Sequence, residues 1–321
     1  MARLNARRRQ HLNARFTYRL LHIGFHSSRS VFVGLPLLQR GEKRGRLAGH
    51  KLRAPHGVRL ARLNRANGYA RLRQIGGSDL RGLRTTARRD GAHWILNGQK
   101  TFISSGIMAD LVVVAARTGD KLSLFVVERD TPGFERGRKL DKIGLPGQDT
   151  SELYFRDAEV PAANLLGDEG KGLGYLMSHL PRERLGVTAE AIATSRAIFD
   201  QTAEYCRQRQ AFGAPLTDKQ HIRFELAEMA TEIDIAQAFV DQSVIAYNAG
   251  ELTPIDAAKG KWYVSELQKR VIDRCLQLHG GFGYMLEYPV ARAYVDTRVK
   301  TIYGGTTEIM KEIIGRDIAA C

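Results

Sequence analysis

The sequence predicts an α+β protein in which an antiparallel β domain, residues 76–167, is followed by a C-terminal four-helix bundle, residues 168–321. Three observations support this prediction. Short apolar runs of strand length fill the first region. Apolar residues recur at helical spacing over long stretches of the second region. The period changes at the glycine-rich segment LLGDEGKGLG, residues 165–174, which therefore marks the boundary between the domains.

The β domain is predicted to contain several strands joined by tight turns. DGAHWILNGQKTFISSG, residues 90–106, alternates apolar and polar residues around Asn97-Gly98, which predicts a hairpin with its turn at that pair. Three further runs have the length and apolar content of strands: ADLVVVAART (109–118), LSLFVVERD (122–130) and ELYFRDAEVP (152–161). The first two of these are separated only by Gly-Asp-Lys, so they are expected to be neighbours.

The C-terminal region is predicted to be a bundle because long amphipathic helices with short links pack side by side. Pro254 is well suited to the first turn of a helix and is expected to begin the third one. The predicted helices span about residues 171–208, 217–249, 254–279 and 289–301, and after a turn at YGGTT a last helix ends near residue 318.

The positive charge of the chain is confined to its first quarter. The formal net charge is +15. Residues 1–75 contain 18 lysines and arginines and one acid, Glu42, which gives this segment a net charge of +17. The other 246 residues carry 31 basic and 33 acidic side chains, a net charge of −2. The body of the protein is therefore nearly neutral, and a nucleic-acid-binding function has no support outside this segment.

Three interpretations of residues 1–75 compete. An organelle transit peptide is rich in arginine and poor in acids, but this segment is long and its VFVGLPLL run is not amphipathic. A nucleic-acid-binding arm would be expected to contain interleaved aromatic residues or a known motif. The favoured interpretation is a segment translated out of its ancestral frame or otherwise unrelated to the rest of the chain. Its high charge and weak periodicity predict disorder or loose helix.

Composition excludes several other classes of protein. No apolar run approaches the roughly 20 residues of a membrane-spanning helix. The three cysteines, Cys206, Cys275 and Cys321, are odd in number and lack the spacing of metal ligands, which predicts a reducing compartment, the cytoplasm, and no metal site. A Walker loop and a G-x-G-x-x-G motif are both missing from the sequence.

An ordered series of motifs resembles the flavin-dependent acyl-CoA dehydrogenases across residues 77–318. Each motif alone is weak, since paired glycines are common at helix ends, but the complete order is specific. The resemblance begins abruptly at Gly76-Gly77, and the helical domain that this family has at its N-terminus is not recognisable in residues 1–75. The motifs are GGSDLRGLRTTARRDG, LNGQKTFISSG, SLFVVERDTPGF, RKLDKIGL, RQAFGAPL, QLHGGFGYMLEYPVARAYVDTRV and IYGGTTEIMKEIIGR.

The resemblance assigns the catalytic base. Most members of the family carry a glutamate after the tyrosine of the Y-x-G-T turn, but this position is Gly304 here. The long-chain and isovaleryl-type branch carries the base on the first C-terminal helix in the motif E-R-L, which is Glu183 in this chain. The resemblance therefore implies that Glu183 removes the proton, that Arg184 orients the base or the turn, and that Gly304 lies in the substrate site. Without the resemblance, Glu183 between two arginines is open to two interpretations, a surface ion pair or a base whose partners belong to a cofactor site.

The resemblance also implies an FAD site. Phe102, Ile103 and Ser104 of FISSG would face the flavin ring, while the alternative for Phe102 is an ordinary core residue of a strand. Ser78 would lie where acyl-CoA enters. The other cofactor residues, for which caps, turns and helix faces are the alternative, would contact the nucleotide part, partly from a neighbouring subunit: Arg209, Phe212, Gln220, Gln277, Gly280, Gly281, Thr306 and Glu308.

Two functions remain open on the sequence alone. The first is an acyl-CoA dehydrogenase that converts an acyl-CoA to its 2-enoyl-CoA, passes electrons to an electron-transfer flavoprotein and forms a homodimer or homotetramer. The second is a catalytically impaired or inactive remnant that keeps only the oligomerising C-terminal part. Retention of flavin by the purified protein distinguishes them.

Overall fold

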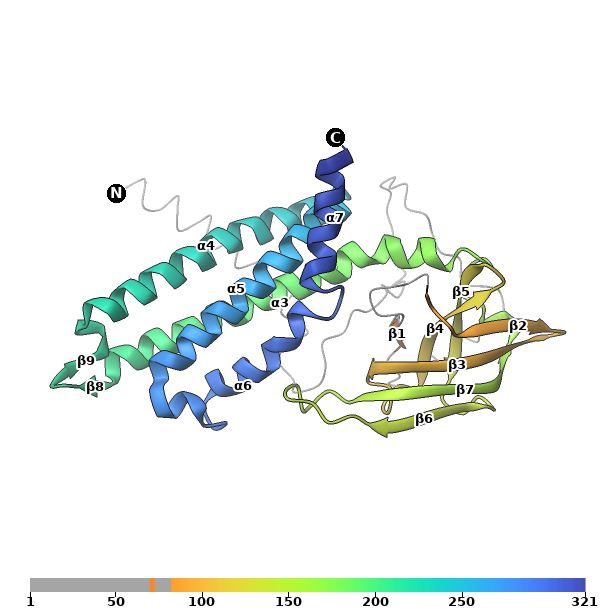
Figure 1. Cartoon of the computed structure of the whole chain (residues 1–321), viewed down its shortest axis with the longest axis horizontal. Helices are drawn as coiled ribbons and strands as arrows, with labels where there is room; N and C mark the ends of the chain where they lie inside the picture. Colours follow the sequence, from red (N-terminus) through yellow and green to blue (C-terminus); the bar gives the residue numbers. More distant parts are fainter. Residues whose placement is uncertain (1–69, 73–81, 321) are drawn as a thin grey trace, which may run out of the picture.

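The computed structural model describes residues 70–72 and 82–320. The predictions of disorder and of an unrelated origin for residues 1–75 fall mainly on residues 1–69 and 73–75, which lie outside the described part. Ser78 lies outside it as well. Figure 1 shows the two domains in the predicted order, with a sheet at one end of the molecule and a helical bundle at the other.

The first domain is a seven-stranded sheet in the order β1-β4-β2-β3-β7-β6, with β5 paired to β4. This sheet is mixed, whereas the prediction was a purely antiparallel one. β1 runs parallel to β4, and Thr86 of β2 forms a parallel pair with Arg117 of β4. The strands are β1 (Ala70–Leu72), β2 (Thr86–Asp90), β3 (His93–Ser104), β4 (Leu111–Thr118), β5 (Lys121–Glu128), β6 (Phe134–Lys139) and β7 (Thr150–Pro161).

The predicted turn at Asn97-Gly98 is wrong, because β3 continues through this pair. The hairpin turn lies earlier, at Gly91-Ala92, where Asp90 of β2 pairs with His93 of β3. At Gly98 the pairing of β3 with β7 shifts register, and φ is +137°. A Cβ atom on Gly98 would lie 2.8 Å from the Cα of Thr85. Glycine is therefore needed at this position because the chain packs closely at a β-bulge. A hairpin turn would call for the same residue type, which explains the wrong prediction.

The remaining strand predictions are confirmed. β4 and β5 pair antiparallel over their whole length and are joined by the two residues Gly119-Asp120. β6 was not predicted, because its sequence FERGRK contains one buried apolar residue. The core of the sheet contains large buried side chains, among them Trp94 and Leu96 of β3, Phe125 of β5, and Leu153 and Phe155 of β7.

The second domain is a bundle dominated by three long helices. The boundaries agree with the prediction within three residues for these helices. The helix predicted over 289–301 is a nine-residue α6 continued by the 3-10 helix η4 (Arg298–Thr301). The helices are α3 (Gly172–Gln208), α4 (Gln220–Ala249), α5 (Pro254–His279), α6 (Pro289–Thr297) and α7 (Thr307–Ala320).

Local signals explain where α4 ends and α5 begins. Gly250 closes α4 with φ of +78°, the left-handed conformation that glycine adopts at helix ends. The hydroxyl of Thr253 accepts a hydrogen bond from the backbone N–H of Asp256, and Pro254 occupies the first turn of α5. These two features confirm the predicted start of the third helix.

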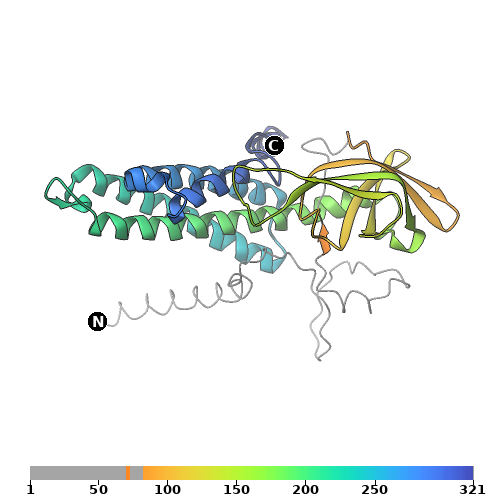
Figure 2. The ribbon, with the colours of Figure 1, turned by 90° about the horizontal axis from the view of Figure 1, so that it is seen from below.

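Within the described residues, two contacts help to join the two domains. At the first, α3 starts against β5, where a Cβ atom on Gly172 would lie 2.8 Å from the carbonyl oxygen of Leu122. At the second, the loop after β6 contacts α6, and the N–H of Leu145 donates to the carboxylate of Asp296 over 2.5 Å. These contacts hold the sheet at one end of the elongated molecule, as Figure 2 also shows. Among the described residues, no helix is long and apolar enough to cross a membrane.

Candidate active and cofactor sites

Glu183 and Arg184 lie on α3 in the half of the helix nearer the sheet (Figure 1). The Glu183 side chain is half-buried. Arg184 is 5% exposed, and its Nε donates to the carbonyl oxygen of Gly304 over 3.4 Å. Burial lowers the pKa of Arg184, and the carboxylate of Glu183 acts in the opposite direction. The residue that follows the predicted base is therefore in contact with the turn that bears the family's other base position.

The turn before α7 is built from two glycines. Gly304 and Gly305 have φ angles of +68° and +102°. A Cβ atom on Gly304 would have no other atom within 4 Å, so the space beside this residue is open. A Cβ atom on Gly305 would lie 2.5 Å from Cε of Met310. The side of the turn at Gly304 can therefore accept additional atoms, in keeping with its predicted place in the substrate site.

Thr306 and Glu308 lie at the start of α7 rather than beside the other predicted nucleotide residues. The hydroxyl of Thr306 accepts a hydrogen bond from the N–H of Ile309 over 3.4 Å. Hydrogen bonds from the backbone of Glu308 and from Thr306 lower the pKa of the Glu308 carboxyl. In this chain the two residues therefore cap a helix next to the Arg184–Gly304 contact, and a cofactor role for them stays a prediction.

Phe102 lies on a bulge near the end of β3. Its side chain is 72% exposed, which excludes the alternative of an ordinary core residue. Its φ is +61°, and the pairing of β3 with β7 shifts between Lys100 and Ile103. A bulky residue in the left-handed region costs of order 1–3 kcal/mol, and such strain gathers at binding sites. The backbone therefore presents an aromatic ring to the outside of the sheet.

Ile103 and Ser104 follow on the same strand but are buried. Ile103 packs in the core of the sheet and is 4% exposed, so its side chain does not face a ligand. Its backbone pairs with Ser151 of β7. Ser104 is 7% exposed and pairs with Thr150. Of the three residues predicted to face the flavin, Phe102, Ile103 and Ser104, only Phe102 has a side chain that is open to solvent.

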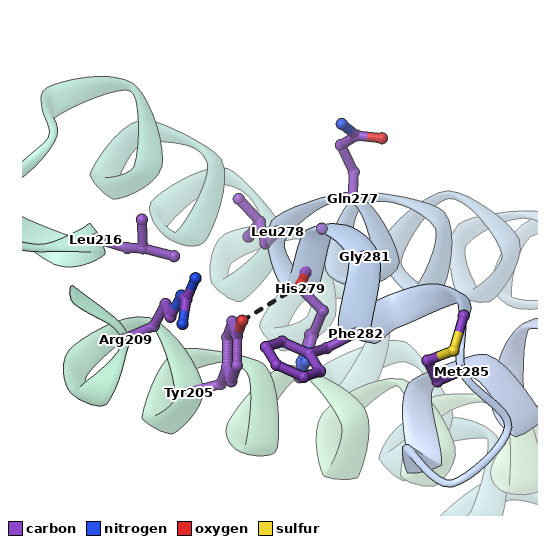
Figure 3. A pocket seen from close by; sticks show the side chains of 10 residues that line it. Tyr205, Arg209, Leu216, Gln277, Leu278, His279, Gly281, Phe282 and Met285 are labelled. Carbon is purple, nitrogen blue, oxygen red and sulfur yellow. Dashed lines mark hydrogen bonds between the residues drawn. The ribbon is translucent and has the colours of Figure 1, made fainter. Parts of the chain in front are cut away.

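A pocket of about 510 Å³ lies where α3 ends against the end of α5. It brings together four of the predicted cofactor residues, namely Arg209, Gln277, Gly280 and Gly281. Gly280 has φ of +58°, and a Cβ atom on either glycine would meet no other atom within 4 Å. The backbone is thus open toward the pocket at both positions. Figure 3 shows the side chains of Arg209 and Phe282 lining the pocket, whereas the side-chain amide of Gln277 points away from the Phe282 ring.

The pocket also contains residues that the sequence did not single out. The guanidinium carbon of Arg209 lies 5.8 Å from the centre of the Phe282 ring, a cation–π distance. Tyr205 stacks on His279 with ring centres 4.2 Å apart, and its hydroxyl donates to the His279 carbonyl, the dashed line in Figure 3. Burial lowers the pKa of His279. In the sequence, the position of Phe282 within the HGGFG motif was the feature that could have pointed to a place in this pocket.

Phe212 and Gln220 lie beyond the pocket, around the two-stranded hairpin of β8 (Gln210–Ala211) and β9 (Ala214–Pro215). Phe212 is 97% exposed and has φ of +53° at the tip of this hairpin. Gln220 is the exposed first residue of α4. Like Phe102, Phe212 is an aromatic side chain that a strained backbone holds in solvent.

One chain does not bring all the predicted cofactor residues together. Figures 1 and 2 place the sheet at one end of the molecule and the β8–β9 hairpin at the other. Arg209 and Gly280 lie at the hairpin end, whereas Glu183 and Gly304 lie between the ends. Within the described residues, no group of three or more histidine, cysteine, aspartate or glutamate side chains has the arrangement of a metal site.

Two family models match this chain. Residues 74–158 match the model of the acyl-CoA dehydrogenase middle domain. Residues 170–319 match the model of the acyl-CoA dehydrogenase C-terminal domain. The two matches correspond to the sheet and to the bundle.

Individual proteins give the same result. The long-chain specific acyl-CoA dehydrogenase of pig (Sus scrofa) mitochondria is 49% identical over 249 residues, which are 75% of this chain and 58% of the relative. The NADH-dependent acryloyl-CoA reductase of Anaerotignum propionicum is 39% identical over 81% of this chain and 68% of the relative. The crystal structure of an acyl-CoA dehydrogenase from Geobacillus kaustophilus superimposes with a TM-score of 0.74 at 51% identity, covering 76% of this chain and 66% of that one.

The match to the mammalian relative leaves a large part of that protein uncovered, since this chain spans 58% of its length. The matched part nevertheless contains the predicted base, the glycine turn and the pocket. Fold, family models and relatives agree over the whole sheet and bundle. The chain belongs to the acyl-CoA dehydrogenase family.

Proposed function

We propose that this protein is an FAD-dependent acyl-CoA dehydrogenase in which Glu183 is the catalytic base. The observation that carries the proposal is the contact of Arg184 with the carbonyl of Gly304. Through this contact the residue that follows Glu183 reaches the turn at Gly304, the other position at which the family carries its base. A carboxylate is present at the first position and open space at the second. The substrate carbon is expected to lie in that space.

The role of Glu183 follows from its chemistry and surroundings. A carboxylate oxygen takes the proton from the carbon next to the thioester, which is general base catalysis. The buried guanidinium of Arg184, the next residue, interacts electrostatically with the Glu183 carboxylate. Bound acyl-CoA would cover the half-buried side chain and displace water, which makes a carboxylate more basic.

The chain has suitable residues for FAD at both ends of the molecule. Arg209 offers a guanidinium for a phosphate, and Gly280 and Gly281 leave their backbone open to the pocket. Phe102 offers an exposed aromatic ring that would contact the flavin ring, whereas Ser104 on the same strand is buried in this chain. These residues fit an extended dinucleotide. When bound, FAD supplies a hydride acceptor, so the product is a 2-enoyl-CoA.

The separation of these residues favours assembly. Because Phe102 belongs to the sheet and Arg209 lies at the far end of the bundle, we infer that a flavin contacting both types of residue is contacted by two chains. We therefore infer a homodimer or homotetramer in which Arg209, Phe212 and Gln220 reach the nucleotide held by a neighbour. An electron-transfer flavoprotein is the inferred electron acceptor. The cysteines predict a cytoplasmic location, whereas the pig relative is mitochondrial. Cell fractionation distinguishes the two locations.

The proposal is tested by loading the purified full chain with FAD and supplying saturated acyl-CoA of short and of long chain with an artificial electron acceptor. We expect stoichiometric flavin after gel filtration and formation of 2-enoyl-CoA. An oligomer that holds no flavin and forms no product would contradict the proposal and support the inactive remnant instead.

A further inference from the structure

Lys261 is a fully buried lysine that neither the motifs nor the proposed mechanism uses. It lies on α5, is 0% exposed, and its Nζ donates to the carbonyl oxygen of Gly305 over 2.5 Å. Burial, together with the nearby cation of Arg184, lowers its pKa to about 8, whereas Glu266 and Glu308 act in the opposite direction. Burying an ammonium group costs several kcal/mol unless its surroundings compensate. The burial of the Lys261 ammonium group therefore calls for a structural or functional explanation.

The reason suggested by the geometry is the glycine turn. Two consecutive carbonyl groups of this turn accept hydrogen bonds from buried cations on two different helices. Arg184 on α3 binds the carbonyl of Gly304, and Lys261 on α5 binds that of Gly305. Glycine backbones have many accessible conformations, and both of these residues are in the left-handed region. Two charged donors select one conformation among them.

The helices are shaped so that the two cations lie side by side. Gly260, next to Lys261, allows α5 to approach α3 closely, because a Cβ atom there would lie 3.3 Å from Cγ2 of Thr188. The hydroxyl of Thr188 in turn donates to the carbonyl of Arg184 over 2.8 Å. Helices α3 and α5 therefore pack against each other one turn from Arg184 and next to Lys261.

Helix α5 also holds the far side of the turn. The hydroxyl of Thr307, the first residue of α7, donates to the carboxylate of Glu266 over 2.9 Å. Lys261 and Glu266 thus fix the turn at two points from one helix.

We propose that Lys261 is a positioning residue, whose ammonium group acts with Arg184 to fix the Gly304–Gly305 turn beside the base and so keeps the space at Gly304 open for the substrate. This inference rests on the proposed role of Glu183. Lys261 itself does not touch the reacting atoms. It sets the shape of the wall that the substrate carbon meets, and its loss is expected to impair turnover rather than cofactor retention.

Hydrogen exchange and kinetics of the full-length, FAD-loaded protein test the inference together. The test variant is Lys261→Met, which keeps the volume and removes the donor, and Lys261→Gln keeps a neutral donor. The matched control is Lys100→Met, since Lys100 is a buried lysine of the sheet with a pKa of about 8. We expect amide exchange of residues 304–307 to accelerate about tenfold or more in Lys261→Met, less in Lys261→Gln, and to stay at the wild-type rate in the control.

The kinetic arm separates positioning from a merely structural role. Lys261→Met is expected to lower kcat about tenfold with a smaller change in KM and unchanged flavin content. Unchanged exchange of the turn, or accelerated exchange with wild-type kcat, would overturn the inference. If Lys261→Met does not fold, Lys261→Gln is judged by the same two criteria. A wild-type protein without dehydrogenase activity would refute the proposed function, and the exchange of the turn would still decide whether Lys261 fixes it.

Discussion

The Nε of Arg184 and the carbonyl oxygen of Gly304 are 3.4 Å apart although 120 residues separate them in the chain. Through this contact the first helix of the bundle reaches the turn that precedes the last one. Glu183 is the neighbour of Arg184 in sequence, and the open space at Gly304 belongs to the turn. The contact is therefore the link between the proposed base and the place proposed for its substrate.

Moving the carboxylate across this contact should move the base. In a protein with Glu183→Gly, the second substitution Gly304→Glu is expected to restore part of the lost turnover, because nothing lies within 4 Å of a Cβ atom there. Recovery will be incomplete, since a non-glycine residue at φ of +68° costs of order 1 kcal/mol or more. The measurement is the steady-state rate with acyl-CoA.

Gly305→Glu in the same background is the matched control. A Cβ atom on Gly305 lies 2.5 Å from Met310, and its φ is +102°, so a side chain there is strained and directed elsewhere. Equal recovery from both substitutions would show that proximity to this turn is not what matters. No recovery from Gly304→Glu would remove the argument that the two positions share one substrate carbon.

The pocket at the end of α3 predicts how flavin retention depends on arginine. Arg209→Ala is expected to weaken FAD binding by roughly 10- to 100-fold, because a charge-assisted hydrogen bond to a phosphate contributes about 1.5–3 kcal/mol. Arg207→Ala serves as the control, since Arg207 is an exposed residue of the same helix end, paired with Glu204 and not part of the pocket. Equal flavin affinity of the two variants in equilibrium titrations would argue against a phosphate at Arg209.

The buried lysine of the sheet predicts a pH-dependent stability. Burial lowers the pKa of Lys100 from 10.5 to about 8, so below pH 8 the lysine is protonated in both the folded and the unfolded protein and the full cost of burying the charge is present. Between pH 8 and 10.5 the folded state releases the proton first, and the free energy of unfolding rises with pH. This term is absent from Lys100→Met.

The free energy of unfolding of Lys100→Met minus that of the wild type should therefore fall by about 3 kcal/mol from pH 7 to pH 10.5. Urea unfolding at several pH values measures it. A difference that stays constant across this range would mean that the Lys100 ammonium carries no such cost.

The helices were predictable because their long apolar stripes and caps act locally. Thr253 and Pro254 begin α5 by contacts within one turn, and the same signals are visible in the sequence. The turn at Asn97-Gly98 was mispredicted because a glycine that packs against Thr85 at a bulge is the same residue that a hairpin would require. The parallel pairing of β1 with β4 depends on contacts between distant segments and leaves no local pattern.

The candidate site was predictable where a motif marks it and not elsewhere. Glu183, Gly304 and the Gly280-Gly281 pair belong to motifs of the family. Lys261 carries no such mark, since a single lysine in an amphipathic helix normally faces solvent. Its burial depends on how α5 packs against the neighbouring helices around Gly260, which only the packed structure reveals. The strained, exposed conformation of Phe102 likewise depends on the bulge between β3 and β7.

The central claim, that Glu183 is the base of a flavin-dependent dehydrogenation, is tested most directly by mixing FAD-loaded protein with acyl-CoA in the absence of oxygen and following the visible flavin absorption. We expect rapid bleaching in the wild type and a rate lower by several orders of magnitude in Glu183→Gln, with equal flavin content and with Glu204→Gln, an exposed carboxylate of the same helix, at the wild-type rate. Bleaching of Glu183→Gln at a near-wild-type rate would contradict the claim.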